Sequence, residues 1–206
     1  KKPDEIYSVK FLEPCVGIGI FTIAYIDSLF NLYQKIGGGN TRMFADKIIN
    51  NIYACDIDAE AVVLYKKVVS AFLKYRFNSI IDYRALEKNV YVGDLLFNTK
   101  DIWNFKNSIK SIFPAVFNSG NGFDVVITNP PYRLLKATSN QFDDESIKDE
   151  QALNKEIVYH IKRTGSYQYA DEGTLNYYKL FIEEMMENYS SDNGIVGILV
   201  PITLLS

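Results

Sequence analysis

The chain has 206 residues, of which 48% are hydrophobic and 14% aromatic, and its formal net charge is −3. This length predicts one domain with a sizeable core, and the acidic balance lacks the basic excess that is usual in free-standing nucleic-acid binders. The only cysteines, Cys15 and Cys55, give neither a disulfide framework nor a zinc pattern and fit a reducing compartment. No apolar run approaches membrane-spanning length, and no signal-peptide pattern is present.

The first predicted unit is a strand over residues 6–12, a glycine loop and a helix over residues 21–33. The loop, residues 13–21, reads EPCVGIGIF. In such a unit the backbone approaches a nucleotide closely, and the first amides of the helix point at it. A Gly-x-Gly pair alone is weak support, because many such loops are only tight turns. The glycines at 37–39 are followed by no Gly-Lys-Ser/Thr, so we interpret them as a flexible loop.

A second strand is predicted over residues 51–55, after a short helix over residues 45–50, and it leads to Asp56. An acidic residue at this point of a nucleotide-binding fold can accept hydrogen bonds from both ribose hydroxyls, whereas Asp58 is expected to cap the next helix. That helix, residues 59–76, is amphipathic. Its predicted apolar side consists of Ala61, Val62, Leu64, Tyr65, Val68, Val69, Phe72 and Leu73.

A third strand over residues 89–92 precedes Asp94. Taken alone, Asp94 is as consistent with a helix cap or a turn as with a nucleotide ligand. Residues 101–117 are predicted to be irregular or weakly helical, with Trp103 and Phe105 packing against other residues.

Residues 123–133 read FDVVITNPPYR, a β-branched run that stops at a double proline. Such a run predicts a buried strand that leads into a rigid turn. Pro130 biases Asn129 toward an extended backbone, and because neither proline has an N–H, the main chain there offers only carbonyl acceptors. With the side-chain oxygen of Asn129 and the flat face of Tyr132, this turn suits a planar substrate that carries an amino group. The alternative is a strand that merely happens to end in a Pro-Pro turn.

The last part of the chain begins with a polar, charged stretch over residues 136–156. His160 is the only histidine, and we interpret it as a surface or packing residue because no second histidine or adjacent nucleophile accompanies it. A helix is predicted over residues 175–189, then a turn over 192–194 and a buried strand over 195–200. The predicted buried side of the helix includes Leu180, Phe181, Met185 and Met186.

Two stretches resemble those of a known family. The run LEPxxGxGxF at residues 12–21 resembles the S-adenosylmethionine loop of the adenine-N6 DNA methyltransferases, and NPPY at residues 129–132 resembles their catalytic motif. The cofactor loop comes first, an order similar to the branch whose target-recognition domain follows the catalytic region. The chain is especially similar to the methylase domains of bacterial type II and type IIG restriction-modification enzymes.

The resemblance implies a role for each candidate residue. Glu13 would face the methionine ammonium of S-adenosylmethionine, Asp56 its ribose, and Asp94 its adenine amino group. The implied cofactor site comprises Glu13, Pro14, Gly17, Gly19, Phe21, Asp56, Ile57, Asp94 and Leu95. The implied catalytic residues, which hold and stack on a flipped-out adenine without a metal or a covalent nucleophile, are Asn129, Pro130, Pro131 and Tyr132. Residues 136–156 resemble the family's variable segment beside the substrate, for which mobility is expected.

The alternation of strands and helices predicts a doubly wound, Rossmann-like α/β fold, with a mostly parallel sheet between helices. The candidate residues all follow strands, at the edge where such sheets bind ligands. By the resemblance, residues 1–206 form one methyltransferase catalytic domain of a larger protein. The implied function is site-specific methylation of adenine N6 in double-stranded DNA, within a restriction-modification system of the bacterial cytoplasm. A recognition domain outside these residues would contact the DNA, and a restriction subunit or a fused nuclease domain is the other implied partner; no membrane is involved.

Three alternatives stay open. The first is a methyltransferase for another planar nitrogen, in RNA adenine or protein glutamine, although those relatives usually carry Asp-x-Gly-x-Gly in the loop. The second is a nicotinamide-dependent oxidoreductase, which the missing third loop glycine and the unexplained NPPY run disfavour. The third is a non-catalytic binding module, which the intact NPPY run at residues 129–132 disfavours.

Overall fold

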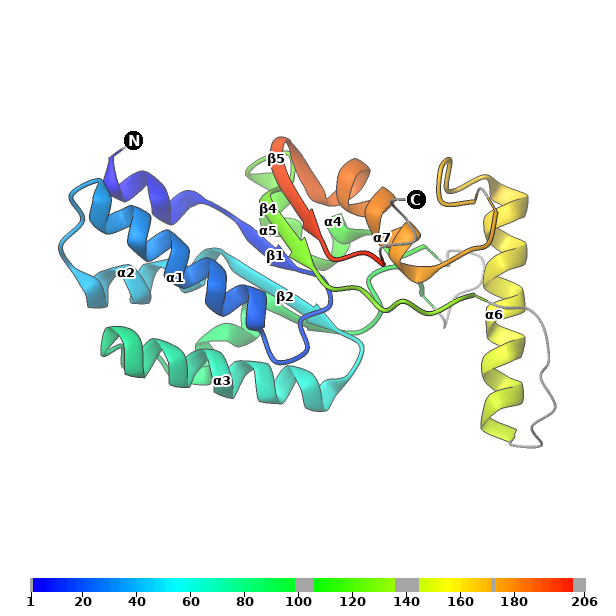
Figure 1. The fold of residues 1–206 in the computed structure, drawn as a ribbon, viewed down its shortest axis with the longest axis horizontal. Helices are drawn as coiled ribbons and strands as arrows, with labels where there is room; N and C mark the ends of the chain where they lie inside the picture. Colours follow the sequence, from blue (N-terminus) through cyan, green and yellow to red (C-terminus); the bar gives the residue numbers. More distant parts are fainter. Residues whose placement is uncertain (1, 99–105, 136–144, 172, 202–206) are drawn as a thin grey trace.

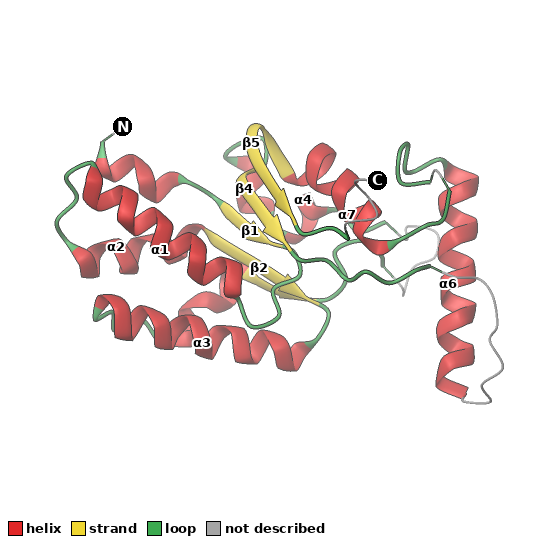
Figure 2. Cartoon of the chain, in the orientation of Figure 1, coloured by secondary structure: helices red, strands yellow, loops and turns green. Residues whose placement is uncertain are grey.

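The computed structural model of the chain describes residues 2–98, 106–135, 145–171 and 173–201, and these contain a five-stranded sheet (Figures 1 and 2). Each described strand pair is parallel, and the order is β3-β2-β1-β4-β5. The strands are β1 (Phe11–Glu13), β2 (Ile52–Asp56), β3 (Val90–Val92), β4 (Phe123–Thr128) and β5 (Ser190–Ile198). The predicted parallel, Rossmann-like α/β fold is therefore confirmed.

The chain reverses direction across the sheet next to β1. It proceeds from β1 through β2 to β3 at one edge, and then returns to β4 on the other side of β1. The carboxyl ends of β1 and β4 thus border the topological switch point, where open α/β sheets bind their ligands.

Each face of the sheet has its own hydrophobic core, because successive side chains of a strand point to opposite faces. On one face, Phe11, Ile52 and Ala54 pack with α1 (Ile20–Lys35), α2 (Thr41–Ile48) and α3 (Ala59–Phe77). On the other face, Leu12, Tyr53 and Cys55 belong to the core that includes α4 (Ile109–Ile112), α5 (Pro114–Asn118), α6 (Glu145–Thr164) and α7 (Tyr177–Glu184). This alternation determines which side chains of each strand face each layer of helices.

The first fifty residues contain more helix than predicted. Pro3–Ser8 forms a 3-10 helix instead of the start of a strand over residues 6–12, since proline suits the first turn of a helix. The helix predicted over residues 45–50 begins earlier, as α2, because the Asn40 side chain caps it by accepting a hydrogen bond of 2.9 Å from Met43 N. A 3-10 turn, Ile49–Asn51, follows α2, and another, Tyr83–Asn89, precedes β3.

Helix α3 matches its prediction closely. Asp58 is its N-cap and accepts a hydrogen bond of 2.8 Å from Glu60 N. The predicted apolar side is wrong at Leu64, which is 47% exposed, because the buried stripe runs through Val62, Tyr65, Val69 and Leu73.

The segment after the NPPY turn differs from its prediction. Helix α6 occupies the described part of residues 136–156, where no helix was predicted, and residues 136–144 lie outside the described residues. The mobility expected for this stretch stays a prediction. Ile157 and Ile161 anchor α6 in the second core. In Figure 1 this helix stands at the end of the molecule, beyond the carboxyl edge of the sheet.

The last strand is longer than predicted. Phe123 of β4 pairs with Ser190 of β5, and Val125 pairs with Ile195. Residues 191–194 therefore form a bulge within β5 rather than a separate turn. The expected burial of this strand is also wrong at Ile195, which is 65% exposed. Among the described residues β5 pairs only with β4 and forms an edge of the sheet.

Helix α7 continues as a π-helical turn, Met185–Tyr189. Met185 is buried as predicted, but Met186 is 65% exposed and the prediction for it is wrong. Trp103 and Phe105, predicted to pack, lie outside the described residues. No helix within the described part of the chain is long and apolar enough to cross a membrane.

Candidate active site

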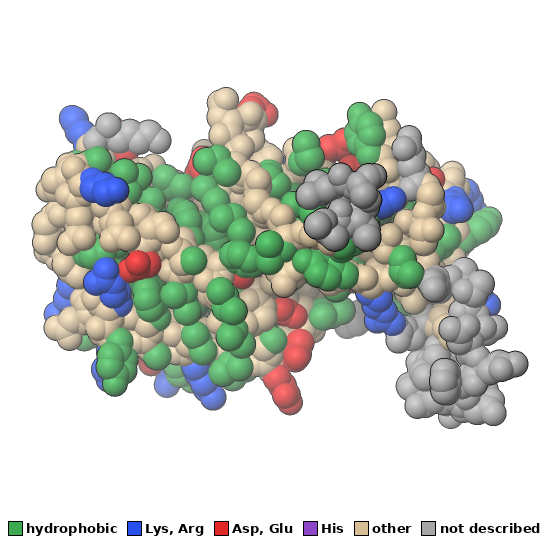
Figure 3. Space-filling view, in the orientation of Figure 1, with side chains coloured by type: hydrophobic (Ala, Val, Ile, Leu, Met, Phe, Trp, Pro, Cys, Tyr) green, Lys and Arg blue, Asp and Glu red, His purple; other side chains and the backbone are tan. Residues whose placement is uncertain are grey.

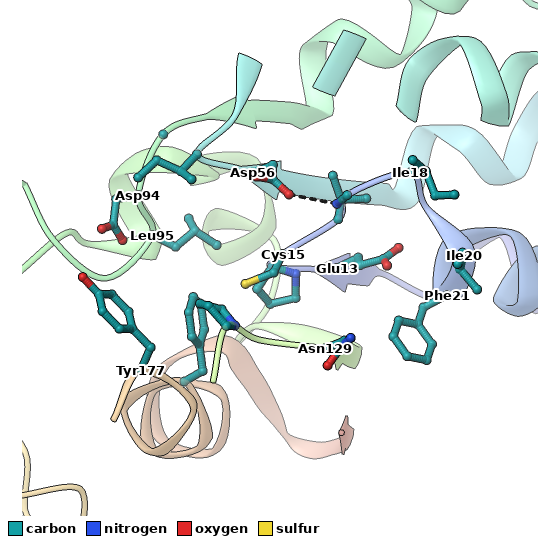
Figure 4. Close-up of a pocket in the computed structure, with 17 residues that line it drawn as sticks. Glu13, Cys15, Ile18, Ile20, Phe21, Asp56, Asp94, Leu95, Asn129 and Tyr177 are labelled. Atoms are coloured by element: carbon teal, nitrogen blue, oxygen red, sulfur yellow. Dashed lines mark hydrogen bonds between the residues drawn. The ribbon is translucent and has the colours of Figure 1, made fainter. Parts of the chain in front are cut away.

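A cavity of about 470 Å³ lies at the carboxyl edge of the sheet, beside the switch point (Figure 4). The ends of β1, β2, β3 and β4 and one face of α7 contribute to it. Its lining includes the predicted residues Glu13, Pro14, Gly17, Phe21, Asp56, Ile57, Asp94, Leu95, Asn129 and Pro131. It also includes Cys15, Val16, Ile18, Ile20, Gly93, Tyr177 and Phe181, which were not predicted as site residues. Gly19, Pro130 and Tyr132 lie outside the lining.

Glu13 ends β1 with a carboxylate that is only 1% exposed. Its Oε2 accepts two hydrogen bonds from Thr22 in the first turn of α1, at 2.8 Å from the backbone N and 2.5 Å from Oγ1. Burial raises the pKa of Glu13 to about 7, although the bonds from Thr22 oppose this shift. The site therefore holds a carboxylate that gains from a cation placed beside it.

Asp56 ties the glycine loop to the end of β2. Its Oδ2 accepts a hydrogen bond of 2.8 Å from Gly17 N, and its Oδ1 accepts one of 3.0 Å from Asp58 N. A carboxylate has about four lone-pair positions, so both oxygens keep capacity for a further donor. Asp56 thus shapes the loop as well as facing the cavity.

The two glycines of the loop are required for different reasons. Both have positive φ, 49° at Gly17 and 82° at Gly19, a region that L-residues with a Cβ seldom adopt. A Cβ on Gly19 would lie 2.6 Å from the Tyr65 ring, so this glycine allows α1 to pack on α3. A Cβ on Gly17 would meet no atom within 4 Å, and Gly17 lines the cavity.

Asp94 follows β3 and is both a turn residue and a cavity residue. Its Oδ1 accepts hydrogen bonds from Leu96 N at 2.7 Å and Phe97 N at 3.2 Å. The Asn107 side chain donates to its main-chain oxygen. Burial raises the pKa of Asp94, against the effect of the two amide bonds. Because both amides bind Oδ1, the geometry leaves Oδ2 outside this turn.

The NPPY turn follows β4 directly. Asn129 is exposed and reaches the cavity, whereas Pro130 is buried beneath it. The Tyr132 hydroxyl donates a hydrogen bond of 2.8 Å to Asn129 Oδ1, and the Tyr132 ring, 49% exposed, meets Tyr178 edge-on at 6.3 Å. Acceptor and aromatic face therefore lie next to each other at the rim of the site.

The chain beyond the turn is fixed to the start of α7. Arg133 O accepts a hydrogen bond of 3.1 Å from Tyr177 N, and Leu135 N donates one of 3.0 Å to Leu175 O. This pairing brings Tyr177 and Phe181 into the cavity. Neither residue was predicted as a site residue from the sequence. Their i, i+4 spacing in the sequence puts them on one face of α7, but only the pairing with residues 133–135 turns that face toward the cavity.

The cysteines near the site are poor nucleophiles. Cys15 lines the cavity, and burial raises the pKa of its thiol to about 12. Burial also raises the pKa of Cys55, which lies in the second core. Both stay protonated at neutral pH, which agrees with the interpretation that they are small packing residues.

Two solved structures share this fold over most of the chain. The chain is similar to the cryo-EM structure of a DrdV–DNA complex, with a TM-score of 0.56 and 20% identity over 92% of this chain. It is also similar to the ATP-dependent Type ISP restriction-modification enzyme LlaBIII bound to DNA, with a TM-score of 0.55 and 14% identity over 92% of this chain. It spans 17% and 12% of those chains, respectively, and at this identity the likeness concerns the fold. No curated protein matches the sequence.

The family comparison covers most of the chain. The profile of the Eco57I restriction-modification methylase matches residues 50–206. This range contains Asp56, Asp94 and the NPPY turn, and it begins after the glycine loop. The chain therefore belongs to the Eco57I restriction-modification methylase family.

Proposed function

We propose that this domain transfers a methyl group from S-adenosylmethionine to the N6 amino group of an adenine in DNA. Membership of the methylase family supports methyl transfer in a restriction-modification system. The choice of cofactor and of adenine N6 rests on one observation: three carboxylates and Asn129 converge on a single cavity from the ends of four neighbouring strands. The carboxylates belong to Glu13, Asp56 and Asp94.

The cavity residues fit this cofactor. A volume of about 470 Å³ lies within the range of roughly 300–1,000 Å³ that small-molecule sites occupy. The buried carboxylate of Glu13 suits the cofactor's ammonium, and Asp56 suits its ribose. Ile57 and Leu95 offer apolar contacts to its adenine, beside Asp94. When bound, S-adenosylmethionine supplies a methyl group on a sulfonium, which is already electrophilic.

The chain's own task is to prepare the amino group that accepts the methyl. Its lone pair is delocalised into the adenine ring and is a weak nucleophile. Asn129 Oδ1 and the Pro130 carbonyl are acceptors for its two hydrogens, and holding both localises the lone pair toward the cofactor side. Formation of the new bond from N6 to the methyl carbon would break the bond between that carbon and sulfur and leave a neutral thioether, and one of the two amino hydrogens would leave as a proton by way of its acceptor to solvent. Pro130 and Pro131 stiffen the turn, so the turn loses little conformational freedom when the base binds and reacts.

Access to the base requires that it leave the DNA duplex, at a cost of a few kcal/mol. The exposed ring of Tyr132 is a stacking platform, and stacking on an aromatic contributes about 1–3 kcal/mol per base. The net charge of −3 offers little general attraction for phosphates. On the face of the molecule drawn in Figure 3, the Lys and Arg side chains are scattered rather than gathered in one stripe. We therefore propose that a recognition domain outside residues 1–206 binds the DNA. A fused nuclease or a separate subunit would cleave it.

Calorimetry and a transfer assay test this proposal. S-adenosylmethionine should bind the domain and NAD should not. With tritiated S-adenosylmethionine and adenine-containing DNA, label should appear in N6-methyladenine after digestion to nucleosides, in a protein that retains its recognition domain. Binding of NAD alone would contradict the proposal. Label in RNA or in a protein glutamine, with none in DNA, would keep the cofactor and change the substrate.

A further inference from the structure

Tyr177 is the first residue of α7 and lines the cavity next to Asp94. We propose that Tyr177 is a specificity-determining residue, whose hydroxyl and the Asp94 carboxylate together recognise the 6-amino group of the cofactor's adenine. This inference rests on the proposed function and adds a second polar group to the base end of that site. Neither the loop motif nor the NPPY motif contains Tyr177.

The geometry places the two polar groups at the same end of the cavity. In Figure 4 the Tyr177 hydroxyl is directed toward the Asp94 carboxylate, and both side chains are far from Phe21. They reach this end from different parts of the fold, because Asp94 follows β3 whereas Tyr177 opens α7.

Phe97 holds both members of the pair. Its backbone N donates a hydrogen bond of 3.2 Å to Asp94 Oδ1, and its ring meets the Tyr177 ring edge-on at 6.1 Å with an interplanar angle of 74°. The main chain of Tyr177 is fixed as well, by the hydrogen bond of 3.1 Å to Arg133 O. A polar pair fixed on both sides can select between ligands without first paying to order its side chains.

The chemistry of the pair matches an amino group. Burial, with a contribution from the negative charge of Asp94, raises the pKa of Tyr177, so its phenol is neutral. Its hydroxyl is directed toward the Asp94 carboxylate, which attracts the phenol hydrogen, so the phenol oxygen acts toward the ligand as an acceptor (Figure 4). The turn amides bind Asp94 Oδ1, so Oδ2 can accept one amino hydrogen and the phenol oxygen can accept the other. A 6-oxo group would instead turn a lone pair toward the carboxylate, which is unfavourable.

The competing explanation is that Tyr177 only packs. Its ring contacts Phe97, and Phe181 lies one turn away on the same helix. A phenylalanine at position 177 preserves that packing and removes only the hydroxyl. Packing alone therefore predicts no change in the preference between two ligands that differ at the 6-position of the base.

The test measures the binding of S-adenosylhomocysteine and of its deaminated counterpart, S-inosylhomocysteine, by calorimetry. The unmodified chain should prefer the adenosyl ligand at least about 50-fold, and Tyr177→Phe should reduce this ratio about tenfold, which is the effect of losing one hydrogen bond of about 1.4 kcal/mol. Tyr178→Phe, the next tyrosine of the same helix, lies outside the cavity lining and should leave the ratio unchanged.

The outcomes separate this inference from the proposed function. If the unmodified chain prefers the adenosyl ligand and Tyr177→Phe keeps the full ratio, the role of Tyr177 is refuted while the cofactor assignment stands. If Tyr178→Phe lowers the ratio as much as Tyr177→Phe, the effect comes from helix packing and the inference is also refuted. If the unmodified chain binds neither ligand, both proposals fail.

Discussion

The Tyr132 hydroxyl donates a hydrogen bond of 2.8 Å to Asn129 Oδ1, the same oxygen that the proposed reaction requires as an acceptor for the adenine amino group. Ring and hydroxyl of Tyr132 therefore have opposite effects on base binding. The ring offers a stacking face, whereas the hydroxyl occupies one acceptor position on Asn129. An incoming base must share this oxygen or displace the hydroxyl.

Substitutions at Tyr132 can separate these two effects. Tyr132→Phe keeps the ring and frees Asn129 Oδ1, so the binding of a flipped base should be unchanged or a few-fold tighter. Tyr132→Ala removes the stacking face and should weaken base binding about 10- to 100-fold. The fluorescence of 2-aminopurine at the target position, measured with the protein that carries its recognition domain, reports both. Equal weakening by Phe and Ala would mean that the hydroxyl contributes to binding rather than competes with it.

Asn129 itself should matter for the reaction rather than for the cofactor. Asn129→Ala removes one of the two acceptors for the amino hydrogens, and the rate of methyl transfer should fall about 100-fold or more, as when one preorganised polar group of an active site is lost. Single-turnover kinetics measure the transfer step. Asn121→Ala, at an exposed asparagine just before the same strand, is the matched control and should retain the rate. A small effect of Asn129→Ala would argue that the Pro130 carbonyl alone orients the amino group.

Asp56 and Asp58 offer a matched pair of variants, because they lie two residues apart and have different roles: Asp56 binds the glycine loop, whereas Asp58 caps α3. Asp56→Ala removes the acceptor for Gly17 N and the proposed ribose contact, so S-adenosylmethionine should bind at least about tenfold more weakly. Asp58→Ala removes the cap of α3 and should lower the free energy of unfolding by about 1 kcal/mol with little effect on binding. Calorimetry and urea unfolding on both variants give the comparison. Equal losses of affinity would show that Asp56 acts only through stability.

The sequence predicted the strand ends more reliably than the segments between them. Asp56, Asp94 and Asn129 each lie at or just after the carboxyl end of a strand, and parallel strands bring such ends to one edge. All three residues line the same cavity. Tyr177 escaped prediction because its place depends on the pairing of residues 133–135 with the start of α7, a contact that no local pattern encodes.

The structure of α6 escaped prediction for a related reason. Its sequence is polar around a few apolar positions, so local composition resembles that of a solvated loop. Ile157 and Ile161 give it one narrow buried stripe, and Glu183 of α7 holds the loop that follows it by accepting hydrogen bonds from three successive backbone amides, Gln168 to Ala170. Such tertiary contacts outweigh a weak local signal.

The two loop glycines should respond differently to alanine. Gly19→Ala forces a positive φ and a contact of 2.6 Å with the Tyr65 ring, so it should lower the free energy of unfolding by more than about 2 kcal/mol. Gly17→Ala meets no atom within 4 Å and should cost about 1 kcal/mol from its positive φ alone. Because Gly17 lines the cavity, its substitution should weaken cofactor binding more than its stability loss explains. Thermal unfolding with and without S-adenosylmethionine distinguishes the two; a Gly17→Ala protein that binds normally would place the cofactor away from this loop.

Glu13 should make the stability of the ligand-free domain depend on pH. Its pKa is raised by burial from 4.5 to about 7, so the folded state binds a proton more tightly than the unfolded state does. The resulting stabilisation is fully present below pH 4.5 and is lost as the pH rises through 7. At about 1.4 kcal/mol per pKa unit, the total loss is on the order of 3 kcal/mol.

Urea unfolding at several pH values from 4.5 to 8 measures this dependence. Glu13→Gln keeps an acceptor for Thr22 but cannot ionise, so its free energy of unfolding should fall less than that of the unmodified chain as the pH rises. Glu60→Gln, at an exposed glutamate in the first turn of α3, is the control and should follow the unmodified chain. S-adenosylmethionine should restore stability at pH 8 in the unmodified chain, because its ammonium offsets the buried negative charge. If Glu13→Gln showed the same pH profile as the unmodified chain, the carboxylate would already be compensated within the fold and would not select a cationic ligand.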